Sequence, residues 1–135
     1  PTDTLGTSNS TSLQRRVYLA NSWPADYFIS IHCNANTNPA VNGTEVYVYQ
    51  KNTQAYWMAQ HVLNGIVDAV GTRDNGVRLN PSLYVLRRTS MPAILVELAY
   101  LTNGADALKL RDEQPAFARG IYNGILEYFG FSPNT

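Results

Sequence analysis

The chain has 135 residues, of which 44% are hydrophobic and 15% charged, and its ten basic and ten acidic side chains give a net charge of zero. These values are typical of one globular domain with a core of its own and exclude a disordered chain. Basic residues cluster no further than the pairs Arg15-Arg16 and Arg87-Arg88, so we expect no nucleic-acid partner. The apolar runs are too short to cross a bilayer, so we expect no membrane span.

The hydrophobic pattern predicts elements in the order α-β-β-α-β-β-α-α, preceded by a Ser/Thr/Asn-rich loop or arm over residues 1–11. A first helix over 13–21 is capped by Ser12, and the segments 34–43 and 71–76 are dense in turn residues. Strands are predicted over 26–32, 44–49, 83–87 (as a short strand or extended segment) and 91–98, and further helices over 53–70, 104–110 and 115–129.

Two of the predicted strands contain short, continuously apolar runs, "FISI" at 28–31 and "AILV" at 93–96. Such runs are typical of strands that helices cover on both faces. The sequence therefore predicts an α/β fold: a single three-layer domain over residues 1–135, with a central, mostly parallel or mixed sheet and helices on both faces. No composition shift marks a domain boundary.

Each of these two runs leads directly to a group that can do chemistry. The first strand ends on His32, and side-chain alternation places Ser30, His32 and Asn34 on one face with Cys33 on the other. His32 is interpreted either as a hydrogen-bonded core histidine or as a metal ligand or general base. Cys33 is expected to be a small buried hydrophobe, unreactive and turned away from His32.

The second run ends on Glu97, inside an otherwise apolar strand. An unpaired carboxylate in such surroundings has a strongly raised pKa, or costs several kcal/mol to bury. One interpretation is a salt bridge to Arg87 or Arg88, and the other is a catalytic carboxylate or metal ligand. If the two strands run parallel, His32 and Glu97 lie close together at one edge of the sheet. His61, the second of two histidines, lies inside a predicted helix without a ligand-spaced partner and is interpreted as structural or surface-exposed.

Three segments resemble the zinc-dependent N-acetylmuramoyl-L-alanine amidases of the type-3 family. They are "ADYFISIHCNAN", "GTEVYVY" and "LYVLRRTSMPAILVELAYLTN". The upstream "LQRRVYLAN" is similar to that family's helix before the strand, through Arg16, Ala20 and Asn21. The S-I-H-x-N-A and P-A-I-L-V-E blocks together carry the resemblance, which extends over nearly the whole chain.

The resemblance implies an enzyme that cuts the amide between the lactyl group of muramic acid and the first L-alanine of the peptidoglycan stem. It implies a Zn²⁺ cofactor, with His32 as a zinc ligand and Glu97 as the general base that takes a proton from the zinc-bound water. Asn34, by its position, is expected to line the substrate groove. The implied partner is peptidoglycan and the implied location is secreted or in the cell wall; we expect a monomer.

One departure from the family pattern affects the metal site. The glycine-rich block with the family's first His and the family's ligand Glu have no counterpart in the 135 residues. The chain therefore resembles the C-terminal portion of such a domain, truncated at its N-terminus, with a sheet edge left uncovered. Two other hypotheses stay open: a non-catalytic peptidoglycan-binding remnant, and an unrelated zinc peptidase-like hydrolase. The retention of both His32 and Glu97 favours the amidase.

Overall fold

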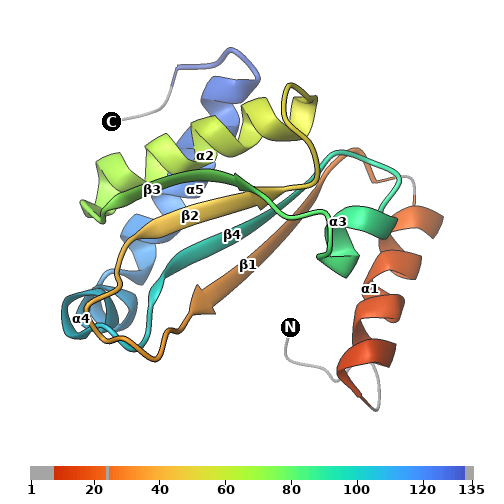
Figure 1. Cartoon of the computed structure of the whole chain (residues 1–135). Helices are drawn as coiled ribbons and strands as arrows, with labels where there is room; N and C mark the ends of the chain where they lie inside the picture. Colours follow the sequence, from red (N-terminus) through yellow and green to blue (C-terminus); the bar gives the residue numbers. More distant parts are fainter. Residues whose placement is uncertain (1–7, 24, 133–135) are drawn as a thin grey trace.

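The computed structural model describes residues 8–23 and 25–132 of the chain. It shows a four-stranded sheet with helices on both faces (Figure 1). In chain order the elements are α1 (Asn9–Ser22), β1 (Phe28–Asn34), β2 (Thr44–Val48), α2 (Gln54–Val70), β3 (Asp74–Leu79), α3 (Tyr84–Arg88), β4 (Ala93–Tyr100), α4 (Gly104–Asp112) and α5 (Gln114–Tyr128).

The strands are ordered β1-β4-β2-β3 in the sheet. β1 runs parallel to β4 and β2 runs parallel to β3, whereas β2 and β4 are antiparallel. The sheet is therefore mixed, and β1 forms one of its edges. The predicted α/β class with a mixed central sheet is confirmed.

Helices lie on both faces of the sheet. α2 packs on β2, β3 and β4, and α5 packs behind it against α2 (Figure 1). The larger core on this face includes Val46, Ile66 and Ile94, none of which is exposed. α1 and α3 lie on the other face, over a smaller core. No helix within the described residues is long and apolar enough to span a membrane.

Several element boundaries differ from the sequence prediction. α1 begins at Asn9 rather than after Ser12, because Ser8 caps it: the Ser8 side chain accepts from the Thr11 N–H, and Thr11 Oγ1 accepts from the Ser8 N–H. The predicted loop over 1–11 is thus wrong for residues 9–11, and residues 1–7 lie outside the described part of the chain. The predicted strand at 83–87 is also wrong, since this segment forms α3, whose Val85 and Leu86 pack into the smaller core.

The strand β3 was not predicted, because its first residues, Asp74, Asn75 and Gly76, are typical of a turn. Its register against β2 shifts: Thr44 pairs with Asp74, but Val46 pairs with Val77. Gly76 lies within this shift with φ +84°, a conformation that glycine adopts without strain. The shift is a bulge that accommodates the turn-like residues inside a paired strand.

Glycine permits a backbone-to-backbone approach between α2 and α5. A Cβ atom on Gly124 would lie 2.5 Å from the carbonyl oxygen of His61 and 2.6 Å from the Cα atom of Val62. We expect Gly124→Ala to lower the free energy of unfolding by about 2–3 kcal/mol, because rigid backbone atoms must separate. Urea denaturation measures this. Gly104→Ala is the control, since nothing lies within 4 Å of its added Cβ; equal midpoints for the two variants would contradict this packing.

Candidate active site

Adjacent parallel strands bring His32 and Glu97 side by side. The two residues are direct register partners in the β1–β4 ladder, so their side chains share one face of the sheet. The predicted proximity is confirmed. Neither residue ends its strand, however: β1 continues to Asn34 and β4 to Tyr100.

A groove of about 380 Å³ opens on this face, between the sheet and the helices α1 and α3. Its floor crosses three strands in order, from His32 and Asn34 on β1, over Glu97 on β4, to Tyr47 on β2. The remaining lining residues are Leu13, Ser30, Asn80, Leu83, Tyr84, Val85 and Leu95. The groove therefore collects all three residues that the sequence singled out for chemistry.

A second and larger cavity, of about 660 Å³, lies between α1 and the edge strand β1. It shares Ser30 and His32 with the groove, and its other lining residues are mostly apolar. Trp23 and Ile31 at this edge are 75% and 52% exposed. The expectation of an uncovered sheet edge thus agrees with the exposed apolar side chains along β1.

Glu97 supplies the carboxylate among the described residues that line the groove. Its burial, reinforced by the nearby Glu45 carboxylate, raises the pKa of Glu97 to about 7. Within residues 8–23 and 25–132, its buried Oε2 atom has no hydrogen-bond partner, and Glu97 forms no salt bridge to Arg87 or Arg88. Near neutral pH such a carboxylate exchanges a proton readily, which a general base requires.

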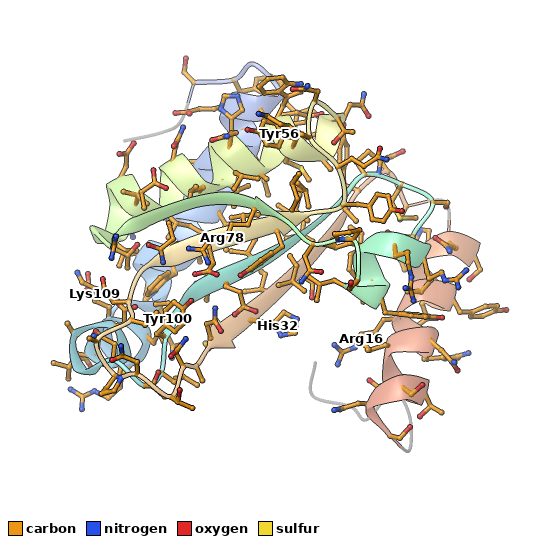
Figure 2. The ribbon with its side chains drawn as sticks, viewed as in Figure 1. Arg16, His32, Tyr56, Arg78, Tyr100 and Lys109 are labelled. Carbon is orange, nitrogen blue, oxygen red and sulfur yellow. The ribbon has the colours of Figure 1, made fainter. Side chains whose placement is uncertain are left out.

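His32 is held as a neutral imidazole. Its Nε2 atom lies 2.8 Å from Ser30 Oγ. Burial, together with the positive charge of Arg16, lowers the pKa of His32, and Figure 2 shows Arg16 reaching from α1 toward the imidazole ring. A neutral imidazole is the form that binds metals. The Arg16 Nε atom is itself buried, with no hydrogen-bond partner in the part of the chain that the structure describes.

Glu45 is a buried carboxylate that the sequence analysis missed. It is not exposed at all, and it pairs directly with Glu97 across the β2–β4 ladder. Its oxygens accept hydrogen bonds from Arg78 Nη1 at 2.9 Å, from the Tyr100 hydroxyl at 2.8 Å and from the Tyr47 hydroxyl. The signal was available: in "TEVYVY", alternation places Glu45 and Tyr47 on the same face.

A β-bulge directs Tyr100 into this cluster. His32 pairs with Glu97, but Asn34 pairs with Tyr100, so β4 has one residue more than β1 over this stretch. Ala99 consequently packs into the larger core on the far face, while the Tyr100 hydroxyl reaches Glu45. Burial, aided by the Glu45 carboxylate, raises the pKa of Tyr100 to about 12. Sequence alternation alone would have placed Tyr100 on the wrong face.

The structure also decides the remaining candidate residues. Cys33 is exposed, so the prediction that it is buried is wrong. The reason is its place on the edge strand, beyond the strands that α2 covers. Cys33 is absent from the groove that His32 and Asn34 line, as alternation requires. His61 lies on α2 with Nδ1 3.8 Å from Glu127 Oε2, partly exposed and outside the groove.

The described residues do not complete a zinc site on their own. Among residues 8–23 and 25–132, no group of three or more His, Cys, Asp or Glu side chains is placed to hold a metal ion. A protein zinc site requires at least three protein ligands. The groove supplies one neutral imidazole beside one carboxylate, which fits a partial site only.

This arrangement defines a class of protein. A partly buried carboxylate with a pKa near 7, next to an imidazole of lowered pKa in a groove of a layered α/β domain, is suited to a hydrolase that transfers protons to and from water. A family model described as N-acetylmuramoyl-L-alanine amidase matches residues 2–127. The chain belongs to this family, and the resemblance seen in the sequence is confirmed.

Individual relatives agree with the family match. The chain is 39% identical over 132 residues to N-acetylmuramoyl-L-alanine amidase LytC of Bacillus subtilis (strain 168), covering 93% of this chain and 26% of the relative. It is 40% identical over 135 residues to N-acetylmuramoyl-L-alanine amidase CwlM of Bacillus licheniformis, covering 96% of this chain and 51% of the relative.

A solved structure shows the same fold. The crystal structure of N-acetylmuramoyl-L-alanine amidase from Clostridium difficile 630 superposes with a TM-score of 0.80 and 39% identity, over 87% of this chain and 64% of that chain. The chain thus spans from about a quarter to half of the two curated relatives and about two thirds of the solved structure.

Proposed function

We propose that the polypeptide containing this chain hydrolyses the amide between the lactyl group of N-acetylmuramic acid and the first L-alanine of the peptidoglycan stem. The observation that carries the proposal is the register pairing of His32 with Glu97 in one groove. Membership of the amidase family supports it and argues against an unrelated peptidase. A pKa of about 7 at Glu97 is a property that a purely binding module does not need.

In this proposal Glu97 is the general base. Ionised near neutral pH, it takes a proton from the water that attacks the amide carbonyl, and it then delivers that proton to the departing alanine nitrogen. Its Oε2 atom, which has no hydrogen-bond partner among the described residues, is the atom suited to hold the proton. Burial, reinforced by the Glu45 carboxylate opposite it, disfavours the negative charge on Glu97, so the protonated form of Glu97 is accessible at neutral pH.

His32 is proposed as one ligand of a zinc ion whose other ligands lie outside the described residues. Its depressed pKa keeps the imidazole neutral, and Ser30 orients the ring. Zinc, when bound, lowers the pKa of a coordinated water to about 7 and polarises the amide carbonyl.

Asn34 is proposed to contact the sugar–peptide junction of the substrate. It lies at the β1 end of the groove, and its Oδ1 atom accepts a hydrogen bond of 2.9 Å from the Ala35 N–H, which fixes the orientation of the amide. A peptidoglycan substrate implies that the parent polypeptide acts in the cell wall after secretion, and a groove formed within one chain is compatible with a monomer.

A matched histidine pair tests the proposed function. In an active polypeptide that contains this chain, we expect His32→Ala to lose bound zinc and to stop the release of new alanine amino groups from peptidoglycan. His61→Ala is the control, since His61 lies partly exposed outside the groove, and we expect it to keep both properties. Metal analysis and amino-group labelling are the measurements. Release of reducing sugar ends instead of alanine amines would contradict the amidase assignment.

A further inference from the structure

Arg78 lies on β3, next to the groove residue Tyr47 and on the side of the groove away from His32, although it does not itself line the groove. In the β2–β3 ladder it pairs with Tyr47, which lines the groove, and two residues later Asn80 lines the groove as well. Figure 2 shows Arg78 on the sheet face that also carries His32 and Tyr100. A substrate that extends along the groove from the β1 side to the β3 side therefore approaches Arg78.

Two hydrogen bonds hold the guanidinium of Arg78. Its Nη1 atom donates to Glu45 Oε2 at 2.9 Å and its Nε atom donates to the Asn75 carbonyl oxygen at 3.3 Å. The Arg78 side chain is nevertheless 47% exposed, whereas that of Glu45 is 1% exposed. Because a guanidinium has five N–H donors in a planar fork, these two contacts leave further donors on its solvent side. The buried carboxylate thus holds a half-exposed cation in a fixed orientation.

The positive charge of Arg78 affects the electrostatic potential of the groove. Glu97 lines the groove and the buried Glu45 carboxylate lies beside it across the β2–β4 ladder, and both carboxylates repel an anionic ligand. A peptidoglycan stem is anionic, because its residues carry carboxyl groups that are not used in the chain linkage. Arg78 supplies the compensating positive charge at the β3 end, and Arg16 supplies one beside His32. Planar guanidinium groups bind carboxylates through two parallel hydrogen bonds.

We propose that Arg78 binds a carboxylate of the stem peptide and so determines a preference for stems in which that carboxylate is free. The inference rests on the proposed function. Arg78 lies two strands away from Glu97 in the order β4-β2-β3 and two residues further along, because Glu97 pairs with Glu45 whereas Arg78 pairs with Tyr47. At about 4.8 Å per strand and about 3.3 Å per residue, the separation is roughly 12 Å. An extended chain covers about 3.4 Å per residue. The carboxylate is therefore that of the second or third residue of the stem.

Four small substrates distinguish a carboxylate on the second residue of the stem from one on the third. They are a muramyl dipeptide with the second-residue carboxyl free or amidated, and a muramyl tripeptide with the third-residue carboxyl free or amidated. For one of the two positions, we expect the wild type to prefer the free acid over the amide by about 10-fold or more in kcat/KM. This is the ratio that the free energy of one charge-assisted hydrogen bond produces. In Arg78→Gln that preference falls to near unity, and in Arg78→Lys it falls in part.

The acid-to-amide ratio is measured on one enzyme preparation, so the fraction of active protein cancels and a loss of stability does not imitate the effect. Arg111→Gln is the matched control, since Arg111 pairs with its neighbour Asp112 on α4, outside the groove, and its ratio remains that of the wild type. Calorimetric binding of the same four compounds to the Glu97→Gln variant gives a second acid-to-amide ratio without turnover, with and without Arg78→Gln.

The outcomes distinguish the two proposals. An unchanged ratio in Arg78→Gln, in an enzyme that does release alanine amines, overturns the role of Arg78 and leaves it as the counter-ion of Glu45. A wild type that releases no alanine amine from any of the compounds overturns the proposed function; the binding ratio then still decides on Arg78. Equal binding of acid and amide forms at both positions overturns the inference about Arg78.

Discussion

Glu97→Gln is expected to lower kcat for amide hydrolysis by about 10²–10⁴-fold, the usual contribution of a general base. Gln has the shape of Glu but cannot accept the proton of the attacking water. KM and bound zinc change little, because the proposed metal ligand is His32 and not Glu97. Steady-state kinetics on a muramyl peptide, with metal analysis of the same samples, measures all three quantities.

The melting temperature of Glu97→Gln shows whether this variant folds as the wild type does. The pKa of Glu97 is raised from 4.5 to about 7, so ionisation disfavours the folded state. The protonated Glu97 side chain therefore stabilises the folded wild type fully below about pH 4.5, and this stabilisation is lost as the pH rises through 7. We therefore expect metal-free Glu97→Gln to gain in melting temperature over the wild type at pH 8 but not at pH 4. The control for this stability change is Glu127→Gln, since Glu127 lies on the exposed surface of α5. For catalysis, wild-type turnover in Glu97→Gln would disprove the role of Glu97 as the base.

Glu45→Leu is expected to lower the free energy of unfolding by about 3 kcal/mol or more. The substitution removes the acceptor for the hydroxyls of Tyr47 and Tyr100 and the partner of Arg78. Each buried donor left without an acceptor costs about 1–3 kcal/mol. Arg78 adds little to this sum, because its half-exposed charge regains water. Guanidinium chloride denaturation of the chain measures the change.

A second glutamate provides the matched control for this cluster. Glu113 lies 3.6 Å from Lys109 in a partly exposed helical pair, so Glu113→Leu is expected to change the free energy of unfolding by less than about 1 kcal/mol. Similar losses in the two variants would contradict the picture of Glu45 as the acceptor of a buried polar network. A stable Glu45→Leu protein would show that its tyrosines find other partners.

The sequence was sufficient to predict the central pair of the site. The apolar runs before His32 and Glu97 identified both strands, and the parallel arrangement expected for such runs is the one that β1 and β4 adopt. The raised pKa of Glu97 was also predictable, since an apolar strand leaves a carboxylate few partners.

The remainder of the site depended on pairings between distant segments, which local patterns do not report. β3 forms from turn-like residues because β2 supplies hydrogen-bond partners, and a bulge at Gly76 accommodates the shift in register between the two strands. Tyr100 joins Glu45 only because a second bulge reverses its side-chain direction. Burial of Cys33 was wrongly predicted because the sequence does not reveal which strand lies at the edge of the sheet.

One measurement tests the central claim most directly: hydrolysis of a muramyl dipeptide in water enriched in oxygen-18, followed by mass spectrometry of the products. For an active polypeptide containing this chain, the account predicts one oxygen-18 atom in the lactyl carboxylate, an unlabelled peptide with a free alanine amine, and the loss of both products in Glu97→Gln. Label in a peptide carboxylate, label at a sugar carbon, or undiminished products in Glu97→Gln would contradict it.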